Sequence, residues 1–430
     1  MHPKILIILT TPFSVSDSSR SLDSYFHFWE RENLRQIYTR NWIPSKGHCG
    51  ELFQITDANL LRMWIHKTDN SGVIYRYDDL LSDDTNKVLQ DNSLVSKTYR
   101  LGAKHTPTIE LLRGLLWRKK YWCTQKLVNW LDQFQPDCIF YNFSNHIFTQ
   151  QIALFAANRY NIPIITAIGD DYYFNDRASI SLAYHLYRII FKRLTRKIFA
   201  WKGSAAFSCD KMKEKYNDVF ELHGESIYLS STTPRREFSY INKKKPIIAY
   251  FGSIRLGRNN SLLDIANALR NIEKSYILEV YSNELDPVYY QQLKEHPNVF
   301  FGGAIPYSMV QERTSHCDIV VVAEGFHKKD INFTKYSLST KAADALACGT
   351  AILAYGPSES GLIGYMLNTE AAMVCTDSNS LEECIRTLII DQNLQRKNYE
   401  RAIIVTHENH TLERSNEVFE GILCKCKLMK

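Results

Sequence analysis

The second half of the chain alternates short apolar runs with helical patterns, and this alternation constrains the fold more than any other feature. The run IIAYFG at 247–252 opens it, and YILEVYS, VFFGG, DIVVVAE and TAILAYG follow, separated by segments with helical periodicity. Strands that alternate with helices form parallel sheets, because each helix carries the chain back to the same edge. We therefore expect a doubly wound, Rossmann-like domain that ends in a helix over ERSNEVFEGILCKC.

The first half shows the same alternation less regularly. Apolar runs at 5–9, 138–143 and 162–169 predict buried strands, and helical patterns cover 111–134 and 147–161. A further helix is expected to begin near Ser19. The pattern at 111–134 should end before the proline at 136, since proline cannot continue a helix. The stretch from about Asn41 to His105 holds turns, acidic patches and isolated aromatic residues, and predicts no regular element.

The length of 430 residues exceeds one ordinary core and suits two domains of roughly 200 residues each. The charged segment INKKKP, directly before the strand at 247, predicts the boundary. We expect an α/β protein with domains at 1–241 and 242–430, both Rossmann-like, facing each other across a cleft, with the C-terminal helix packing back. Ligands of such sheets bind beyond the carboxyl ends of the strands.

Composition excludes several classes of protein. The net charge of +6 is low for a dedicated nucleic-acid binder of this size. The ten cysteines are scattered without a CxxC pair, which argues against a zinc site or a disulfide framework and favours a reducing cytosol. The N-terminal apolar run is too short for a signal peptide, and no stretch reaches the roughly 18 apolar residues of a membrane span. We expect a cytoplasmic protein.

Three segments of the second half resemble the donor-binding domain of GT4-like glycosyltransferases, which have the GT-B fold. They are PIIAYFGSIRLGRNNSLLDIANAL, NVFFGGAIPYSMVQERTSHCDIVVVAE and YSLSTKAADALACGTAILAYGP. The first half resembles the family through QPDCIFY and IPIITAIGDDYY. The resemblance implies a retaining transferase of hexosyltransferase type. It would move a sugar from a nucleotide-sugar to a saccharide or lipid-linked acceptor in bacterial surface-polysaccharide synthesis, with no metal or other cofactor.

The loop after the strand at 247–252 is the first expected donor contact. Gly252 permits a tight turn. Family members place an arginine just after this glycine and a lysine about five residues later, both on the donor diphosphate. Ser253 stands at the arginine position, and Arg258 best matches the lysine. Arg255 and Arg258 are the cations available, and a guanidinium can hold a diphosphate through two hydrogen bonds and stabilise the leaving group. We expect both arginines in the donor site.

The helix STKAADALACG is the second expected donor contact. Ser339 or Thr340 suits the N-cap, and the free N–H groups of the first turn can bind phosphate. Lys341 adds a cation that is unfavourable for the helix alone, which favours a phosphate role. The resemblance puts Asp344 where the family has the second glutamate of its E-x7-E motif, which binds ribose hydroxyls. The first acidic position falls on Tyr336.

Other strand ends supply further candidates. Glu324, at the end of VVVAE, could supply the acid that Tyr336 does not, or be a plain strand-end residue. Asp170 and Asp171 follow the strand at 162–169, where one of them could bind the acceptor hydroxyl or stabilise positive charge on the sugar ring; a turn-capping role is an equal alternative. The loop SVSDSSR stands where the family has a Gly-Gly pair.

The segment YRIIFKRLTRKIFAWKG predicts an amphipathic helix. An apolar stripe is flanked by six cations without an acidic residue: Arg188, Lys192, Arg193, Arg196, Lys197 and Lys202. A second cluster consists of Arg113, Arg118, Lys119 and Lys120 with Trp117 and Trp122. The stripe could simply pack in the core, but such charge also attracts anionic lipid. We expect peripheral association with the inner face of the cytoplasmic membrane, and no nucleic-acid partner.

Two other functions fit the same sequence. A GT-B-fold sugar-nucleotide epimerase would share both domains and the nucleotide site but act on the free sugar nucleotide. A non-catalytic glycosyltransferase-like partner protein would explain the absent Gly-Gly pair, Ser253 and Tyr336, and would bind a donor without transferring it.

Overall fold

A computed structural model describes residues 2–13, 20–66, 71–80, 87–88, 106–176, 179–338 and 340–428 of the chain. The chain forms two compact units. Unit 1 comprises Met1–Ile227 and Asn416–Lys430, and unit 2 comprises Tyr228–Ser415. Each unit contains a sheet in which most or all neighbouring strands are parallel.

Unit 2 is built on a six-stranded parallel sheet in the order β13-β12-β11-β14-β15-β16. This is the strand order of the doubly wound nucleotide-binding fold, which reverses direction between its first and fourth strands, here β11 and β14. The strands are β11 (Ile248–Phe251), β12 (Leu278–Tyr281), β13 (Val299–Gly303), β14 (Ile319–Ala323), β15 (Ala351–Tyr355) and β16 (Met373–Cys375).

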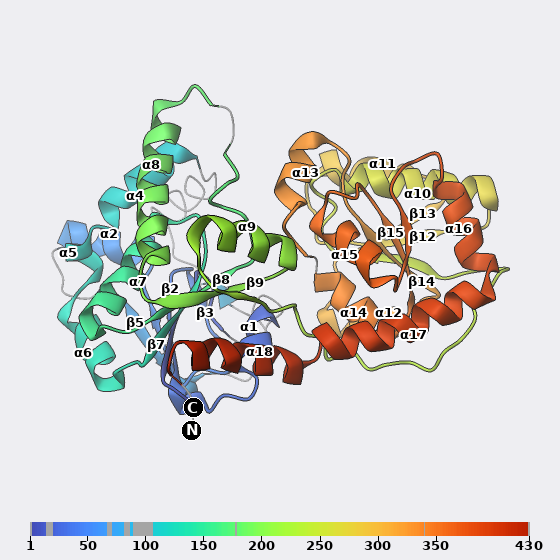
Figure 1. Ribbon diagram of the computed structural model, residues 1–430. Helices are drawn as coiled ribbons and strands as arrows, with labels where there is room; N and C mark the ends of the chain where they lie inside the picture. Colours follow the sequence, from blue (N-terminus) through green and yellow to red (C-terminus); the bar gives the residue numbers. More distant parts are fainter. Residues whose placement is uncertain are drawn as a thin grey trace. The chain divides into compact units, whose positions relative to one another are not determined.

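Helices cover both faces of this sheet (Figure 1). Side chains of β11 alternate between the faces, as a pleated strand requires: Ile248 and Tyr250 join one core, and Ala249 and Phe251 join the other. The helices are α10 (Arg258–Ile272), α11 (Pro287–Glu295), α12 (Tyr307–His316), α13 (Lys328–Thr334), α14 (Thr340–Cys348), α15 (Gly361–Thr369), α16 (Leu381–Ile390) and α17 (Gln392–Asn409).

Unit 1 is built on an eight-stranded sheet in the order β10-β9-β8-β7-β1-β2-β4-β5, parallel except where β5 joins β4. The strand order reverses between β1 and β7. The strands are β1 (Ile5–Ile8), β2 (Leu34–Tyr38), β4 (Glu51–Gln54), β5 (Val73–Arg76), β7 (Cys138–Asn142), β8 (Ile164–Ile168), β9 (Gly203–Phe207) and β10 (Glu225–Ser226). A two-stranded sheet pairs β3 (Trp42–Ile43) with β6 (Lys87–Val88).

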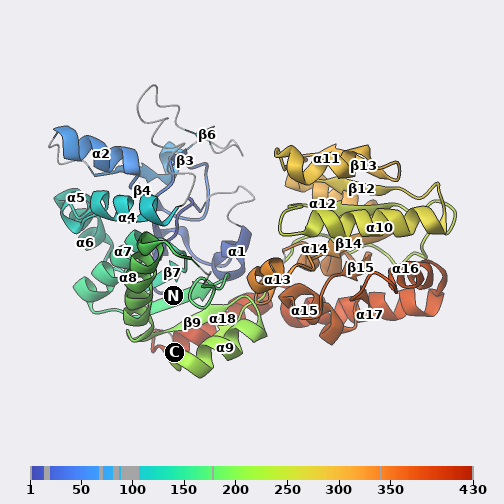
Figure 2. The same ribbon diagram turned by 90° about the horizontal axis from the view of Figure 1, so that it is seen from above.

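The helices of unit 1 are α1 (Arg20–Phe26), α2 (Asp57–His66), α4 (Pro107–Leu116), α5 (Lys119–Trp122), α6 (Gln125–Phe134), α7 (Ile147–Tyr160), α8 (Leu182–Phe199) and α9 (Asp210–Phe220). Figure 2 shows α4, α7 and α8 gathered on one side of this unit. Helix α18 (Leu412–Lys425) returns to the core of unit 1, where Phe419 packs against Phe26 and Trp29 at ring-centroid distances of 5.5 Å. The C-terminal helix therefore packs back as the sequence predicts.

The division into units differs from the expected domains in two places. Residues 228–241, expected in the first domain, belong to unit 2, and residues 416–430, expected in the second, belong to unit 1. The boundary lies before the charged segment, because residues 236–241 are tied to unit 2. Ile241 N–H donates to Gln395 Oε1, and Arg236 donates to the carbonyl of Cys317. The expected cleft between the domains stays a prediction.

Two elements differ from the expected helical pattern. The segment 111–134 forms three helices, α4, α5 and α6, in place of one. The chain turns at Trp117, whose buried indole N–H donates to Asp57 Oδ1, and the indole of Trp122 donates back to the carbonyl of Trp117. The tertiary contact of Trp117 with Asp57, together with the local bond from Trp122, thus outweighs helical periodicity. The stretch expected to be irregular contains β4, α2 and β5, while much of its remainder lies outside the described residues.

Candidate functional site

The carboxyl ends of β11 and β14 lie at the point where the strand order of unit 2 reverses. In open parallel sheets this point forms a crevice that binds ligands. Most of the donor-site residues predicted from sequence follow strands of this sheet. Four of them, Gly252, Arg258, Glu324 and Lys341, come together in one cluster. Tyr250 and Asp330, which the sequence analysis did not name, belong to the same cluster.

Lys341 lies across the end of β11. Gly252 has φ +117°, and a Cβ atom there would come within 2.3 Å of Lys341 Cε. The close approach of the lysine therefore requires a glycine at 252. Lys341 Nζ donates to the hydroxyl of Tyr250 at 2.8 Å. Tyr250 is a buried strand residue that the sequence analysis missed, since nothing distinguishes it from a core aromatic.

Arg258 opens α10 and is held by Glu324 at the end of β14. Arg258 Nε and Nη2 donate to the two carboxylate oxygens of Glu324 at 3.0 and 2.9 Å. The glutamate is buried, and the Gly356 backbone packs against it, since a Cβ at Gly356 would lie 3.0 Å from Glu324 Cβ. The sequence left open whether Glu324 is the donor-sugar acid or a plain strand-end residue, and in the structure its carboxylate positions the Arg258 guanidinium.

The cluster holds two cations close together. Burial and, to a smaller extent, the charge of Arg258 lower the pKa of Lys341, and the charge of Glu324 opposes them, so that the pKa is about 7. A second buried carboxylate, Asp330 on α13, acts on Arg258, and its Oδ2 has no hydrogen-bond partner in the described part of the chain. Sequence analysis missed Asp330, whose only signal was its place between a strand and a helix. An anion bound near Lys341 would relieve the unfavourable pairing of the two cations.

The remaining loop residues do not join this cluster. Arg255 forms a two-bond ion pair with Glu284, with Nη2 2.9 Å from Oε1, and this pair holds the pKa of Glu284 at about 2. The hydroxyl of Ser253 accepts from the Arg255 N–H at 3.3 Å, which shapes the turn. Of the two arginines expected at the donor, the structure brings Arg258 to Lys341 and pairs Arg255 elsewhere.

Asp344 lies on α14, and hydroxyl groups from other segments of unit 2 donate hydrogen bonds to it. Its Oδ1 accepts from Ser231 at 2.6 Å, Tyr307 at 2.9 Å and Thr233 at 3.3 Å, and its side chain is 5% exposed. Protein hydroxyls thus take the place expected for ribose hydroxyls at this oxygen. Ser339 lies outside the described residues, as do the side chain of Thr340 and the loop 14–19.

Unit 1 has a pocket of about 360 Å³ where its strand order reverses. The pocket is lined by residues at or just beyond the ends of β1, β2, β7 and β8: Thr10, Arg40, Asn142, Phe143, Ser144, Asn145, His146, Gly169, Asp170 and Tyr172. Asp170 Oδ2 accepts from the hydroxyl of Tyr172 at 3.1 Å. His146 and Arg40 also line the pocket. Sequence analysis missed Arg40 because it did not predict β2, the strand that Arg40 follows.

The two adjacent aspartates separate. Asp170 lines the pocket, whereas Asp171 turns into the core, where its Oδ1 accepts from the Phe174 N–H at 2.9 Å and from the Tyr216 hydroxyl at 2.8 Å. Asp171 is 6% exposed. It therefore caps a turn, which was one of the alternatives that the sequence left open, and Asp170 is the candidate for chemistry.

The predicted basic faces are partly neutralised. Asp176, in the loop before α8, pairs with Arg188 at 2.7 Å and also with Lys192, and Arg196 donates to the hydroxyl of Tyr173. Trp117 and Trp122 are buried. A short-range sequence pattern missed these contacts because Asp176 comes from a loop outside the helix.

Within the described ranges, no three or more His, Cys, Asp or Glu side chains are grouped so that they could hold a metal ion. The expectation that the protein needs no metal stays a prediction. None of the helices in the same ranges has the length and apolar character needed to cross a membrane.

Comparison with known proteins finds similarity in structure alone. No protein-family model and no curated protein matches the sequence. HepE from Anabaena, in complex with UDP and glucose, is similar over 98% of this chain and 100% of its own, with a TM-score of 0.59 and 12% identity. Sucrose-phosphate synthase from Thermosynechococcus elongatus is similar over 99% and 98%, with a TM-score of 0.55 and 12% identity.

A third similar structure is WaaG, a glycosyltransferase involved in lipopolysaccharide biosynthesis. The similarity covers 97% of this chain and 99% of WaaG, with a TM-score of 0.54 and 11% identity. These three structures are GT-B glycosyltransferases, and each is matched over nearly its whole length. The expected α/β class with two Rossmann-like units is confirmed, and the chain has the GT-B fold.

Proposed function

We propose that this protein is a retaining glycosyltransferase of hexosyltransferase type. It transfers a sugar from a nucleotide-sugar to a saccharide or lipid-linked acceptor in the synthesis of a cell-surface polysaccharide. The observation that carries the proposal is the pair of cations Arg258 and Lys341 at the strand ends of unit 2. The GT-B fold, and the complex of HepE with UDP-glucose, support a nucleotide-sugar as the ligand.

In this proposal the donor diphosphate binds between Lys341 and Arg258. Glu324 fixes the guanidinium before the donor arrives, so that little reorganisation is needed when charge develops on the leaving phosphate. Lys341 supplies the cation that Ser253 does not. The backbone N–H groups at the start of α14 add further donors.

The transfer step breaks the bond between the sugar's anomeric carbon and the diphosphate oxygen. A bond from the same carbon to the acceptor oxygen forms on the same face, so the configuration is retained. The acceptor hydroxyl gives its proton to a leaving phosphate oxygen. Arg258 and Lys341 stabilise the negative charge that the departing nucleoside diphosphate gains.

We assign the acceptor to the pocket of unit 1. Asp170 accepts hydrogen bonds there and suits a sugar hydroxyl, and Arg40 suits an anionic group of the acceptor. We place the protein in the cytoplasm, associated with the inner face of the membrane where lipid-linked acceptors are found.

The test measures donor binding and nucleotide release. Purified protein is mixed with UDP-, GDP-, ADP- and CMP-sugars, and thermal stability and free nucleotide are measured. A donor at 100 times its Kd should stabilise the fold by about 2.7 kcal/mol. Arg258→Ala should lose this stabilisation. Arg386→Ala, which breaks an exposed ion pair with Glu382 in the same unit, is the matched control and should keep it.

The outcomes separate the candidate functions. Binding with slow release of the nucleotide supports the transferase. Binding without release or transfer supports the non-catalytic partner protein, and conversion of the bound sugar to its epimer supports the epimerase. If Arg258→Ala binds every donor as the wild type does, the donor site is wrongly assigned.

A further inference from the structure

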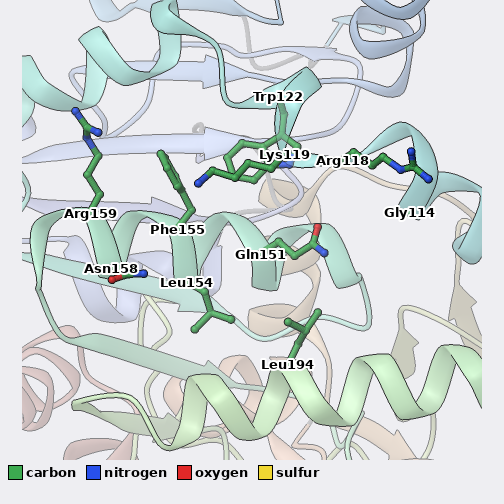
Figure 3. A pocket seen from close by; sticks show the side chains of 10 residues that line it. All are labelled: Gly114, Arg118, Lys119, Trp122, Gln151, Leu154, Phe155, Asn158, Arg159 and Leu194. Carbon is green, nitrogen blue, oxygen red and sulfur yellow. The ribbon is translucent and has the colours of Figure 1, made fainter.

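Unit 1 has a second cavity, far larger than the acceptor pocket, in its helical layer. It measures about 760 Å³ and is bounded by α5, α7, α8 and the end of α4 (Figure 3). Trp122 and Phe155 form an aromatic wall, with ring centroids 5.4 Å apart in an edge-to-face arrangement. Figure 3 shows the amine of Lys119 beside the Phe155 ring, where Nζ lies 4.6 Å from the ring centroid. We call this cavity the α5–α7 groove.

The α5–α7 groove carries excess positive charge. Arg118, Lys119 and Arg159 all line it. Asp132 pairs with Arg159 at 2.7 Å, so one cation is neutralised. Across the ranges that the structure describes, no carboxylate forms an ion pair with Arg118 or Lys119. An anionic group is therefore the chemical class that the groove fits.

Exposed apolar side chains lie on the two helices beside the groove, which pack against each other. On α4, Leu112 is 60% and Leu115 is 53% exposed. On α8, Leu186 is 48% and Ile189 is 65% exposed, and Leu182 precedes them on the same helical face. A soluble surface seldom gathers large apolar residues in this way.

On both helices, cations follow the exposed apolar residues within about one helical turn. Leu112 and Leu115 are followed by Arg118 and Lys119, and Ile189 is followed one turn later by the exposed Arg193. The acidic residues of α4 and of the neighbouring α2 are Glu110 and Asp57, and both pair with Arg113. Apolar side chains next to these exposed cations complement a bilayer with anionic headgroups.

We propose that the α5–α7 groove binds the phosphate headgroup of an anionic phospholipid, while the exposed leucines and isoleucine of α4 and α8 enter the membrane interface. This assignment deepens the proposed function, since it names the surface that holds the enzyme at the membrane. Its cations, Arg118 and Lys119, belong to the second basic cluster named from the sequence, whereas the basic face of α8 is partly neutralised by Asp176.

The test is flotation of the full chain with phosphatidylcholine vesicles, with and without phosphatidylglycerol. We expect binding only when phosphatidylglycerol is present. Changing Arg118→Ala together with Lys119→Ala should lower the partition coefficient about 25-fold, because each cation near an anionic surface contributes about a fivefold effect. The matched control changes Lys244→Ala with Lys245→Ala, two adjacent exposed cations of unit 2, and should float as the wild type does.

A second variant tests whether the exposed apolar side chains of α8 contribute to membrane binding. Leu186→Ser with Ile189→Ser removes exposed side chains, so thermal stability should be unchanged while vesicle binding is lost. Competition with soluble glycerol phosphate tests whether the groove binds a lipid headgroup or a free phosphate compound. We expect that glycerol phosphate does not displace the protein from vesicles. Full displacement would show that the ligand is a free phosphate compound in place of lipid.

Three results would overturn the proposal: equal binding to phosphatidylcholine alone, an equal loss in the Lys244 and Lys245 control, or tighter Arg118-dependent binding to a single-stranded oligonucleotide. Donor-induced thermal stabilisation is measured on the same variants. If vesicle binding behaves as expected and no donor binds, the proposed function fails while the membrane surface stands.

Discussion

Donor binding should take up a proton at Lys341. In the free protein the pKa of Lys341 is about 7, so the side chain is largely neutral in mildly alkaline solution. A diphosphate beside the amine favours the ammonium form and raises this pKa towards its ordinary value, about 10.4. Between these two values only the complex holds the proton, so affinity must fall as the pH rises.

The size of the effect follows from the pKa change. Each pH unit above the lower pKa costs about 1.4 kcal/mol of binding free energy, or tenfold in Kd. Raising the pH from about 6 to about 9 should therefore weaken donor binding roughly a hundredfold, or by about 2.7 kcal/mol. Below about pH 6 the Kd should be constant, because both free and bound proteins hold the proton.

Titration calorimetry measures this directly. Kd is recorded across the pH range with a nucleotide-sugar, whose diphosphate diester does not titrate there, and proton uptake is obtained from buffers that differ in ionisation enthalpy. Lys341→Met should bind weakly with no pH dependence. Lys341→Arg keeps a fixed charge and should show a flat Kd. Gly252→Ala should weaken binding too, because its Cβ would displace Lys341 Cε, 2.3 Å away.

The stability of the free protein gives a second readout. Unfolded chains keep this lysine protonated up to about pH 10.4, whereas the folded protein loses the proton near pH 7, so stability should rise with pH between these values. A wild-type Kd that is constant from about pH 6 to pH 9, or a Lys341→Met protein with wild-type affinity, would refute the reasoning.

The remaining predictions concern the neighbouring aspartates and one buried histidine. Asp170→Asn should lower the rate of sugar transfer at least about tenfold without changing the melting temperature. Asp171→Ala should cost about 1–3 kcal/mol of folding stability, because the Tyr216 hydroxyl loses its acceptor. If kinetics and thermal unfolding showed the reverse pattern, the roles of the two aspartates would be exchanged. His410 donates from Nδ1 to the Leu229 carbonyl at 2.8 Å, and burial lowers its pKa to about 4. Unfolded histidine binds a proton near pH 6.5, so stability should fall by about 3 kcal/mol from there to pH 4. Denaturant unfolding should show this acid loss in the wild type and a flatter profile in His410→Gln.

Local pattern predicted the sheet of unit 2 almost strand by strand. Each apolar run that was interpreted as a strand there is one, because parallel strands buried on both faces need continuous apolar sequence. The same pattern predicted the turn at Gly252, whereas Arg258 was named through the resemblance to GT4-like glycosyltransferases. It failed at 111–134, where the indoles of Trp117 and Trp122 find partners that turn the chain.

The sequence pattern did not predict the direction in which individual side chains point. Asp170 and Asp171 are adjacent and chemically alike, yet one lines a pocket and the other caps a turn, because successive residues point in different directions. Arg255 and Arg258 also looked equivalent, but each pairs with a carboxylate from a different loop, Glu284 or Glu324. Each glutamate lies far from its arginine in the sequence, so local pattern could not reveal the pairing.

The sequence by itself determined the alternation of strands and helices along the chain, and with it the prediction of two doubly wound units. Burial of apolar runs is a local property that composition and period encode. Only the tertiary structure decided which charges meet: that Lys341 crosses Gly252 toward Tyr250, that Glu324 holds Arg258, and that Asp176 neutralises part of the basic helix. Electrostatic interactions depend on distances between residues remote in the chain, and those distances exist only once the sheets have formed.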